Sequence, residues 1–237
     1  MLGSTKELNR LINSLEWTSA IDYIKNHRGL ARVWRPSHLF IDGNQASPVL
    51  PIHRAVALDC PIEVFDVLLK IYPSGLQQSE LGFKRNILHI ACINECSLEL
   101  KEYIIKHYPD AVISKDKYGR LPLHYICINA GQEEDIDLIL KSCKSSVECP
   151  DYNGCLPLHI ACAKGAPPSI VKKLLDAFPC SSILRTNNGD SALDFCNASR
   201  KDVNTQRNKM IILKSINGSK SRISRLKRFP TSIGILV

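Results

Sequence analysis

The sequence predicts an all-α solenoid of helix-turn-helix repeats, and two periodic features predict it. Cys92, Cys127 and Cys162 recur every 35 residues, each inside a similar short segment. A longer apolar run follows each segment, and its central residues keep nearly the same spacing, as in VFDVLLKIYP, LKEYIIKHYP and IVKKLLDAFP. A constant period of 20 to 50 residues indicates stacked units, each too small to bury its own apolar face.

Each repeat is expected to contain two helices. The segment LPLHYICINA from Leu121 has Pro in its first turn, where a missing N–H costs nothing, and helically spaced apolar residues follow. The later apolar run predicts a second, amphipathic helix, which Pro73, Pro109 or Pro179 ends because Pro cannot continue a helix. The stretches DKYG, DYNG and TNNG predict exposed turns between repeats, with glycines in register at Gly119, Gly154 and Gly189.

The two ends of the chain depart from the repeat. Residues 1–32 predict an N-terminal helical cap, helical from Thr5 to Gly29, and residues 33–48 predict a long connecting loop. About five repeats should occupy residues 49–216, with a degenerate last unit in which Asp194 replaces a recurring His. Residues 217–237 predict a basic, flexible C-terminal tail.

Positive charge is concentrated near the C-terminus. The chain has a net charge of +8, but from Arg200 onward it has ten basic residues and one acid. Such an arm can bind anionic membrane or nucleic acid, or serve as a nuclear address. A solubilising tail with no binding role is an equal alternative. The residues expected to bind anions are Lys220, Arg222, Arg225, Lys227 and Arg228.

Several classes of protein are not indicated. No stretch approaches the roughly 20 apolar residues of a membrane-spanning helix, and the polar start lacks a secretory signal's apolar core. We therefore expect an intracellular, cytoplasmic protein, with the nucleus as an alternative. The ten cysteines form no CxxC pair, so buried free thiols are expected rather than a disulfide framework. We expect no metal, no cofactor and no catalytic residues, because the chain has no P-loop, GxSxG, GxGxxG or HExxH motif.

The repeated segments resemble the ankyrin repeat, with its T-P-L-H-x-A motif and two antiparallel helices. Leu156 to Cys162, Leu121 to Cys127 and Ile87 to Cys92 carry the resemblance. It implies a structural role for the recurring histidines, each fixing the turn before its helix by hydrogen bonds to backbone: His53, His89, His124 and His159. Two departures are a period of 35 residues and Leu in place of the Thr before Pro at three repeats. Asn86 and Ser191 can still cap the other two.

The resemblance also implies a monomeric, non-enzymatic scaffold that binds a protein or peptide on a concave face lined by the first helices and turns. By alignment, the face comprises Arg54, Leu58, Ile90, Ile93, Asn94, Tyr125, Ile128, Asn129, Ile160 and Lys164. The turn tips add Lys84, Arg85, Lys117, Tyr118, Arg120, Tyr152 and Asn153. An acidic, partly apolar peptide would complement this surface if its apolar residues are exposed. The alternative is that these residues pack between helices. A second functional hypothesis is an adaptor tethered to anionic membrane or nucleic acid through its basic tail.

Overall fold

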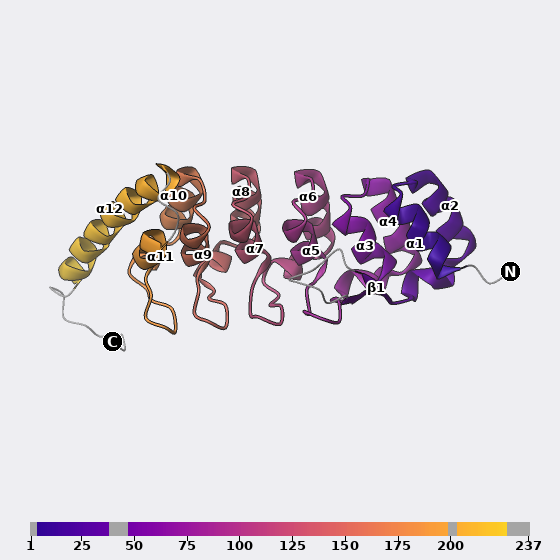
Figure 1. Ribbon diagram of the computed structural model, residues 1–237, viewed down its shortest axis with the longest axis horizontal. Coiled ribbons are helices and arrows are strands. Elements are labelled where there is room, and N and C mark those ends of the chain that lie inside the picture. The colour runs from indigo at the N-terminus through magenta and orange to yellow at the C-terminus, as the bar shows by residue number, and fades with distance from the viewer. Residues whose placement is uncertain (1–3, 38–46, 199–202, 227–237) are drawn as a thin grey trace. The chain divides into compact units, whose positions relative to one another are not determined.

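The computed structural model describes residues 4–37, 47–198 and 203–226, with side chains described as far as residue 218. Contacts divide the chain into two compact units, residues 1–146 and 147–237. The 3-10 turn η4 (Lys144–Glu148) spans the point of division. Both units consist of antiparallel helix pairs, so the prediction of an all-α helix-turn-helix solenoid is confirmed (Figure 1).

The described residues of the first unit form four helix pairs. They are α1 (Thr5–Asn13) with α2 (Trp17–Asn26), α3 (Pro51–Ala57) with α4 (Ile62–Ile71), α5 (Ile87–Ile93) with α6 (Leu98–His107), and α7 (Pro122–Ile128) with α8 (Glu133–Ser142). Three 3-10 turns follow second helices: η1 (Arg28–Arg32), η2 (Pro73–Gln77) and η3 (Pro109–Val112). Pro73 and Pro109 therefore do more than end a helix, because each begins one of these turns.

The second unit contains α9 (Pro157–Ala163) with α10 (Pro168–Ala177), η5 (Pro179–Ser182), and α11 (Ala192–Ala198) with α12 (Val203–Leu226). Helix α12 packs against α10, α11 and η5, and Asn208 at 0 % exposure donates from Nδ2 to the Ala166 carbonyl, 2.8 Å away. The helix continues past residue 217, where the sequence predicted the start of a flexible tail. No structural boundary lies at that residue.

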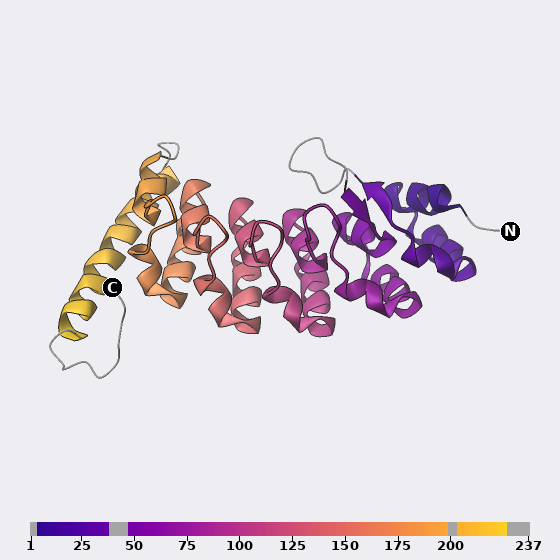
Figure 2. The same ribbon diagram turned by 90° about the horizontal axis from the view of Figure 1, so that it is seen from below.

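The segment predicted as a loop at residues 33–48 contains a small sheet. Strand β1 (Arg35–Ser37) pairs antiparallel with β2 (Ser47–Val49), with Arg35 opposite Val49 and Ser37 opposite Ser47. Three-residue strands are too short to show alternating polarity, so the sequence pattern carried no signal for them. Figure 2 shows β1 and β2 beside the first helix pairs.

The turns inside the helix pairs share one geometry. In each of five pairs, a residue of positive φ follows the first helix, and the next N–H donates to a carbonyl five residues back, as in the helix-ending Schellman motif. The positive-φ residues are Leu15, Asp59, Glu95, Ala130 and Gly165, with φ between 50° and 65°. Leu15 belongs to the turn of α1–α2, so this N-terminal pair turns like the repeats although it lacks the Pro-x-His motif that begins α3, α7 and α9.

The N-terminal pair also shares a core with its neighbour. Leu8 and Ile12 of α1 and Ile24 of α2 are almost completely buried. They line the same small apolar cavity as Val64 and Leu68 of α4. Burying apolar surface against α4 stabilises a helix pair that could not bury its apolar face alone.

The turns between repeats contain a second left-handed position. Gly119, Gly154 and Gly189 have φ of 75°, 77° and 85°, and Lys84, which lies 35 residues before Gly119, has φ of 58°. A side chain in this region raises the conformational energy by about 1–2 kcal/mol. Lys84 is therefore a lysine held in a backbone conformation that suits glycine.

We expect Lys84→Gly to raise the free energy of unfolding by roughly 0.5–1 kcal/mol, because relief of the strained φ exceeds the added entropy of the unfolded chain. Urea denaturation followed by circular dichroism measures the change. Lys117→Gly is the matched control, since Lys117 is an exposed lysine of the next turn and is not among the residues of positive φ. The control should give no gain, and an equal gain from both variants would refute this reason.

Candidate functional site

The four repeated histidines close the first turn of their helices. Each Nδ1 accepts a hydrogen bond from the N–H of the residue three positions earlier, at 3.0–3.2 Å. Since Nδ1 accepts, the proton of the neutral ring lies on Nε2, which donates from His53 to the Gln78 carbonyl, from His89 to Arg120 and from His159 to Leu184. Each of these three histidines thus joins its own helix to the stretch that leads into the next repeat.

Asp194 takes the place of the histidine in α11. Its Oδ2 accepts from the Ser191 N–H at 2.8 Å and from the Ser191 hydroxyl at 2.6 Å. The carboxylate therefore closes the first turn of the helix as the histidines do. An ionised carboxylate has no proton to donate, so Asp194 cannot form the second bond of the histidine pattern.

We expect these histidines to make the fold acid-sensitive. Burial lowers the pKa of His53 and of His89 to about 4, against the opposing effect of their carbonyl partners. The unfolded value is near 6.5, so as the pH falls from 6.5 to about 4 the unfolded chain binds protons that the folded chain does not. Stability present above pH 6.5 is lost across that window, by up to about 3 kcal/mol per histidine.

Urea unfolding of the wild type at several pH values between 7 and 4 measures this loss. His53→Gln should be less stable at pH 7 but should show a shallower dependence on pH. His107→Gln, at an exposed position of α6, should keep the wild-type slope. If His53→Gln also kept that slope, titration of this histidine would not be the cause.

One buried acceptor holds each turn between repeats. Asp116 Oδ1 accepts from the N–H groups of Tyr118 and Arg120 at 2.8 and 2.9 Å. Asp151 makes the same pair of bonds 35 residues later, and Thr186 Oγ1 accepts from the Asp190 N–H in the following turn. The regular spacing of these acceptors was a signal in the sequence, which identified the turns but not this role.

The first turn contains one residue more than the others and uses Glu80. The Glu80 carboxylate accepts from the N–H groups of Gly82, Phe83 and Arg85 and from the Ser47 hydroxyl of β2. The longer side chain of Glu80 spans the larger turn. The extra residue in this turn explains why His53 and His89 are 36 residues apart rather than 35.

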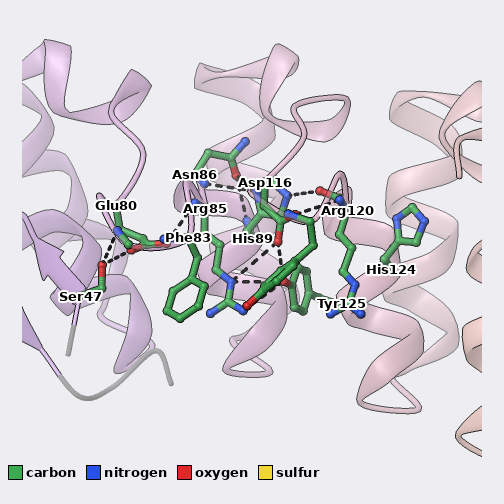
Figure 3. A network of polar contacts seen from close by, with 12 residues as sticks. Ser47, Glu80, Phe83, Arg85, Asn86, His89, Asp116, Arg120, His124 and Tyr125 are labelled. Carbon is green, nitrogen blue, oxygen red and sulfur yellow. Dashed lines mark hydrogen bonds and ion pairs between the residues drawn. The ribbon is translucent and has the colours of Figure 1, made fainter. Parts of the chain in front are cut away.

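Arg85 anchors two adjacent turns from inside the first unit. Its side chain is 1 % exposed, and its Nε lies 3.9 Å from Asp116 Oδ2. The Tyr125 hydroxyl donates to Asp116 Oδ2 at 2.5 Å and accepts from Arg85 Nε and Nη2 at 3.2 and 3.1 Å (Figure 3). Burial raises the pKa of Tyr125 above its usual value, and its bond to Asp116 adds to the effect.

Aromatic rings enclose this cation. The Arg85 guanidinium lies 4.5 Å from the Phe83 ring centre and 5.1 Å from that of Tyr125. Such contacts between a cation and a ring face are favourable, more so when water is excluded. Arg85 was predicted to bind a partner at a turn tip, and its burial shows that it instead forms part of the core.

The structure also corrects the exposure expected for four residues of the first helices. Of the two alternatives left open, packing between helices holds for Ile90, Tyr125 and Ile160, which are at most 8 % exposed. Arg54 is buried too, and it donates to Asn13 Oδ1 and to the Pro36 carbonyl. The position after each histidine therefore points into the fold rather than to solvent.

Other predicted partner residues remain accessible. Leu58, Ile93, Asn94, Ile128 and Asn129 are half-buried, and Lys164 is exposed. The amides of Asn94 and Asn129 also have structural partners, since they donate to the carbonyls of Ile90 and Ile93 at 2.9 and 2.8 Å. In the second unit, the turn residues Tyr152 and Asn153 are exposed.

Two turns of the first unit form a basic, partly aromatic surface, here called the turn surface: Lys84, Lys117, Tyr118 and Arg120. Lys84, Lys117 and Tyr118 are exposed and Arg120 is half-buried. The Arg120 guanidinium lies 5.3 Å from the Tyr118 ring centre, and Lys117 Nζ lies 6.0 Å from that of Phe83. Glu80 and Asp116 are buried as backbone acceptors, so these turns present positive charge outward.

The predicted anion-binding tail lies mostly outside what can be described. Lys220, Arg222 and Arg225 fall within the backbone of α12, but their side chains are not among those described. Lys227 and Arg228 lie outside the described residues. Within residues 4–37, 47–198 and 203–226, no helix is both long and apolar enough to cross a membrane. The same residues contain no group of three or more His, Cys, Asp or Glu side chains arranged to hold a metal.

Family models agree with this geometry. A model described as ankyrin repeats (3 copies) matches residues 52–151, and one described as ankyrin repeats (many copies) matches residues 140–196. The chain belongs to the ankyrin repeat family. Ankyrin repeats commonly mediate protein–protein interaction, and proteins built from them are generally non-enzymatic. A search of curated proteins finds no match to this chain.

Proposed function

We propose that this ankyrin repeat protein is a non-enzymatic adaptor that binds an acidic, partly apolar segment of a partner protein through the turn surface. The observation that most directly supports this proposal is the outward positive charge of Lys84, Lys117 and Arg120 beside the ring of Tyr118, which is 37 % exposed. Opposite charge in the partner would steer the encounter, and the exposed ring would contribute apolar contact.

The structure supports a rigid binding surface. The Lys117 N–H donates to the Phe83 carbonyl at 2.7 Å, which joins the two turns directly. The network of Arg85, Asp116 and Tyr125 holds both turns from within. A surface that is ordered before binding loses less entropy when a partner docks. Half-buried Ile93 and Ile128 lie at the far ends of α5 and α7, so a bound segment would contact them only by running from the turn surface along these helices.

A selection from random twelve-residue peptides tests this proposal. Peptides rich in Asp, Glu and apolar residues should be enriched, and the affinity of a selected peptide can be measured by fluorescence anisotropy. Lys84→Glu/Lys117→Glu should weaken binding at least roughly tenfold. Lys25→Glu/Lys106→Glu makes the same charge change at exposed lysines of α2 and α6 and should have a small effect. Equal losses would show that net charge, rather than the turn surface, binds the peptide.

Tyr125 is unsuitable for that experiment because it is buried against Asp116. Tyr125→Asp would place a second carboxylate beside the first and would report on folding. Ile128→Asp is the more informative change in the first helices, since Ile128 is half-buried. Ile128→Asp should weaken binding of the selected peptide without disturbing the core.

A second proposed function, an anion-directed tether, rests on the ten basic residues and one acid from Arg200 onward. Full-length protein should then bind vesicles containing anionic phosphatidylserine, with an affinity that falls as salt rises. Arg222→Gln/Arg225→Gln should reduce this binding but leave peptide binding at the turn surface unchanged. Binding to duplex nucleic acid with no binding to vesicles would favour the nucleic-acid form of the tether.

A further inference from the structure

A polar pocket lies at the other end of the helix pairs from the turn surface. Helices α5 and α7 begin next to the turns between repeats and end at the turns inside their pairs. The pocket lies between the turn that joins α5 to α6 and the turn that joins α7 to α8, which are neighbouring pairs in Figure 1. Its volume is about 370 Å³, and its charged lining residues are Glu95, Lys101, Glu134 and Asp135.

A buried ion pair forms part of this lining. Lys101 Nζ lies 2.7 Å from Asp135 Oδ1, and the two side chains are 4 % and 10 % exposed. Both residues occupy positions that are apolar in other repeats. At intervals of 35 residues, Asp135 corresponds to Leu100 and Ile170, and Lys101 corresponds to Ile136 and Val171, all of them buried.

A buried ion pair is not the stable choice at such positions, because removing two charges from water offsets most of their attraction. Leucine, isoleucine and valine fill the equivalent positions without that penalty. The polar pair therefore has a better explanation in recognition than in stability, and it occurs where the fold leaves an accessible pocket.

The ion pair leaves hydrogen-bonding capacity unused. Among the described residues, Asp135 Oδ2 accepts no hydrogen bond, although its side chain is nine-tenths buried. Glu95 and Glu134 at the rim are exposed, and neither forms an ion pair with another described residue. Three carboxylates against one ammonium give this lining a net charge of −2.

We propose that this pocket binds a single arginine side chain of a partner protein. A guanidinium offers five N–H donors in a planar fork, which suits the open oxygen of Asp135 together with a carboxylate at the rim. It is also more weakly hydrated than the lysine ammonium, so it enters a half-enclosed polar site at a smaller desolvation penalty. The pocket is thus a second binding site, opposite in charge to the turn surface and independent of it.

The test uses the full chain and three small probes, N-acetyl-arginine amide, N-acetyl-lysine amide and N-acetyl-citrulline amide. Citrulline has nearly the shape of arginine without its charge. We expect the arginine probe to shift the backbone amide resonances of residues 95–98 and 129–135, with at least threefold weaker binding of the lysine probe and no binding of the citrulline probe. Equal shifts from arginine and citrulline, or shifts spread over the whole chain, would overturn the proposal.

Two variants locate the site. Lys101→Ile/Asp135→Leu introduces the apolar residues of equivalent repeat positions, so it should fold and should lose the arginine-induced shifts. Glu134→Gln changes an exposed residue at the rim of the pocket and should weaken binding of the arginine probe about threefold. If the folded double variant still bound arginine with wild-type affinity, the pocket would not be the site. Shifts of the same resonances with protein concentration alone would indicate a second copy of the chain as the occupant and would also overturn the proposal.

The turn-surface variant separates this inference from the proposed function. Lys84→Glu/Lys117→Glu should leave the arginine-induced shifts unchanged, and Lys101→Ile/Asp135→Leu should leave binding of the selected acidic peptide unchanged. Failure of one site would therefore be distinguishable from failure of the other.

Discussion

Replacing Gly154 by alanine is expected to lower the free energy of unfolding of the second unit by about 2–4 kcal/mol. Gly154 has φ of 77°, and an added Cβ would lie 2.6 Å from Asn187 Oδ1 and 2.7 Å from the Asn187 backbone nitrogen. Asn187 cannot easily move away, because its N–H donates to the Asn153 carbonyl and its Nδ2 donates to Tyr152. The change therefore adds a backbone clash to an unfavourable φ.

Gly189→Ala is the matched control for this experiment. Gly189 has φ of 85°, but nothing lies within 4 Å of an added Cβ. Only the conformational penalty of about 1–2 kcal/mol should remain. Urea denaturation of both variants measures the difference. Equal losses of unfolding free energy would mean that the turn containing Asn187 moves to accommodate the added Cβ at no cost in stability.

Asp116→Asn is expected to destabilise the first unit by about 2–3 kcal/mol, because it removes the negative charge that lies 3.9 Å from the buried Arg85 Nε and accepts a hydrogen bond from the Tyr125 hydroxyl. The amide oxygen of asparagine can still accept from the N–H groups of Tyr118 and Arg120, so the turn keeps its acceptor. Urea unfolding at pH 7 measures the loss, which should reflect mainly the missing charge.

Tyr125→Phe tests the same network without changing its charge. It removes the hydroxyl that donates to Asp116 and accepts from Arg85, and we expect a smaller loss of about 1–2 kcal/mol. Should Asp116→Asn destabilise no more than Tyr125→Phe, the hydrogen bonds would dominate the network and the ion pair would contribute little.

The sequence predicted the fold well because each repeat carries its own local signals. Proline at the first turn of α7, the histidine at its third helical position and the Pro that follows α6 each recur in most repeats at intervals of 35 or 36 residues, so helix positions could be assigned from spacing alone. The short pair β1–β2 and the common turn geometry at Leu15 had no such signal. A positive φ at leucine follows from the packing of α1 against α2, which the residue type does not indicate.

The candidate site was predicted less well, since exposure depends on contacts between repeats. Ile90 and Tyr125 were placed on a surface by alignment, but both are buried, and Tyr125 contacts Arg85 of the preceding turn and Asp116 of its own. Arg85 and Tyr125 are 40 residues apart and meet only in three dimensions. Lys117 and Tyr118 were expected in exposed turns and are exposed, because the tip of a turn faces solvent whatever the repeat packs against.

The hydrogen bonds of the histidines give the array a direction. His53, His89 and His159 each reach toward the following repeat, whereas Asp194 can complete only the bond within its own helix. Repeats of this protein are therefore not interchangeable modules. A copy of the repeat that contains His89 can be inserted upstream and will connect to its successor, while a copy of the unit that contains Asp194, placed in the interior, would interrupt the series. An engineered longer array should accordingly receive its extra repeats before α11. Asp194→His would be the first change needed to add repeats after the unit that contains α11.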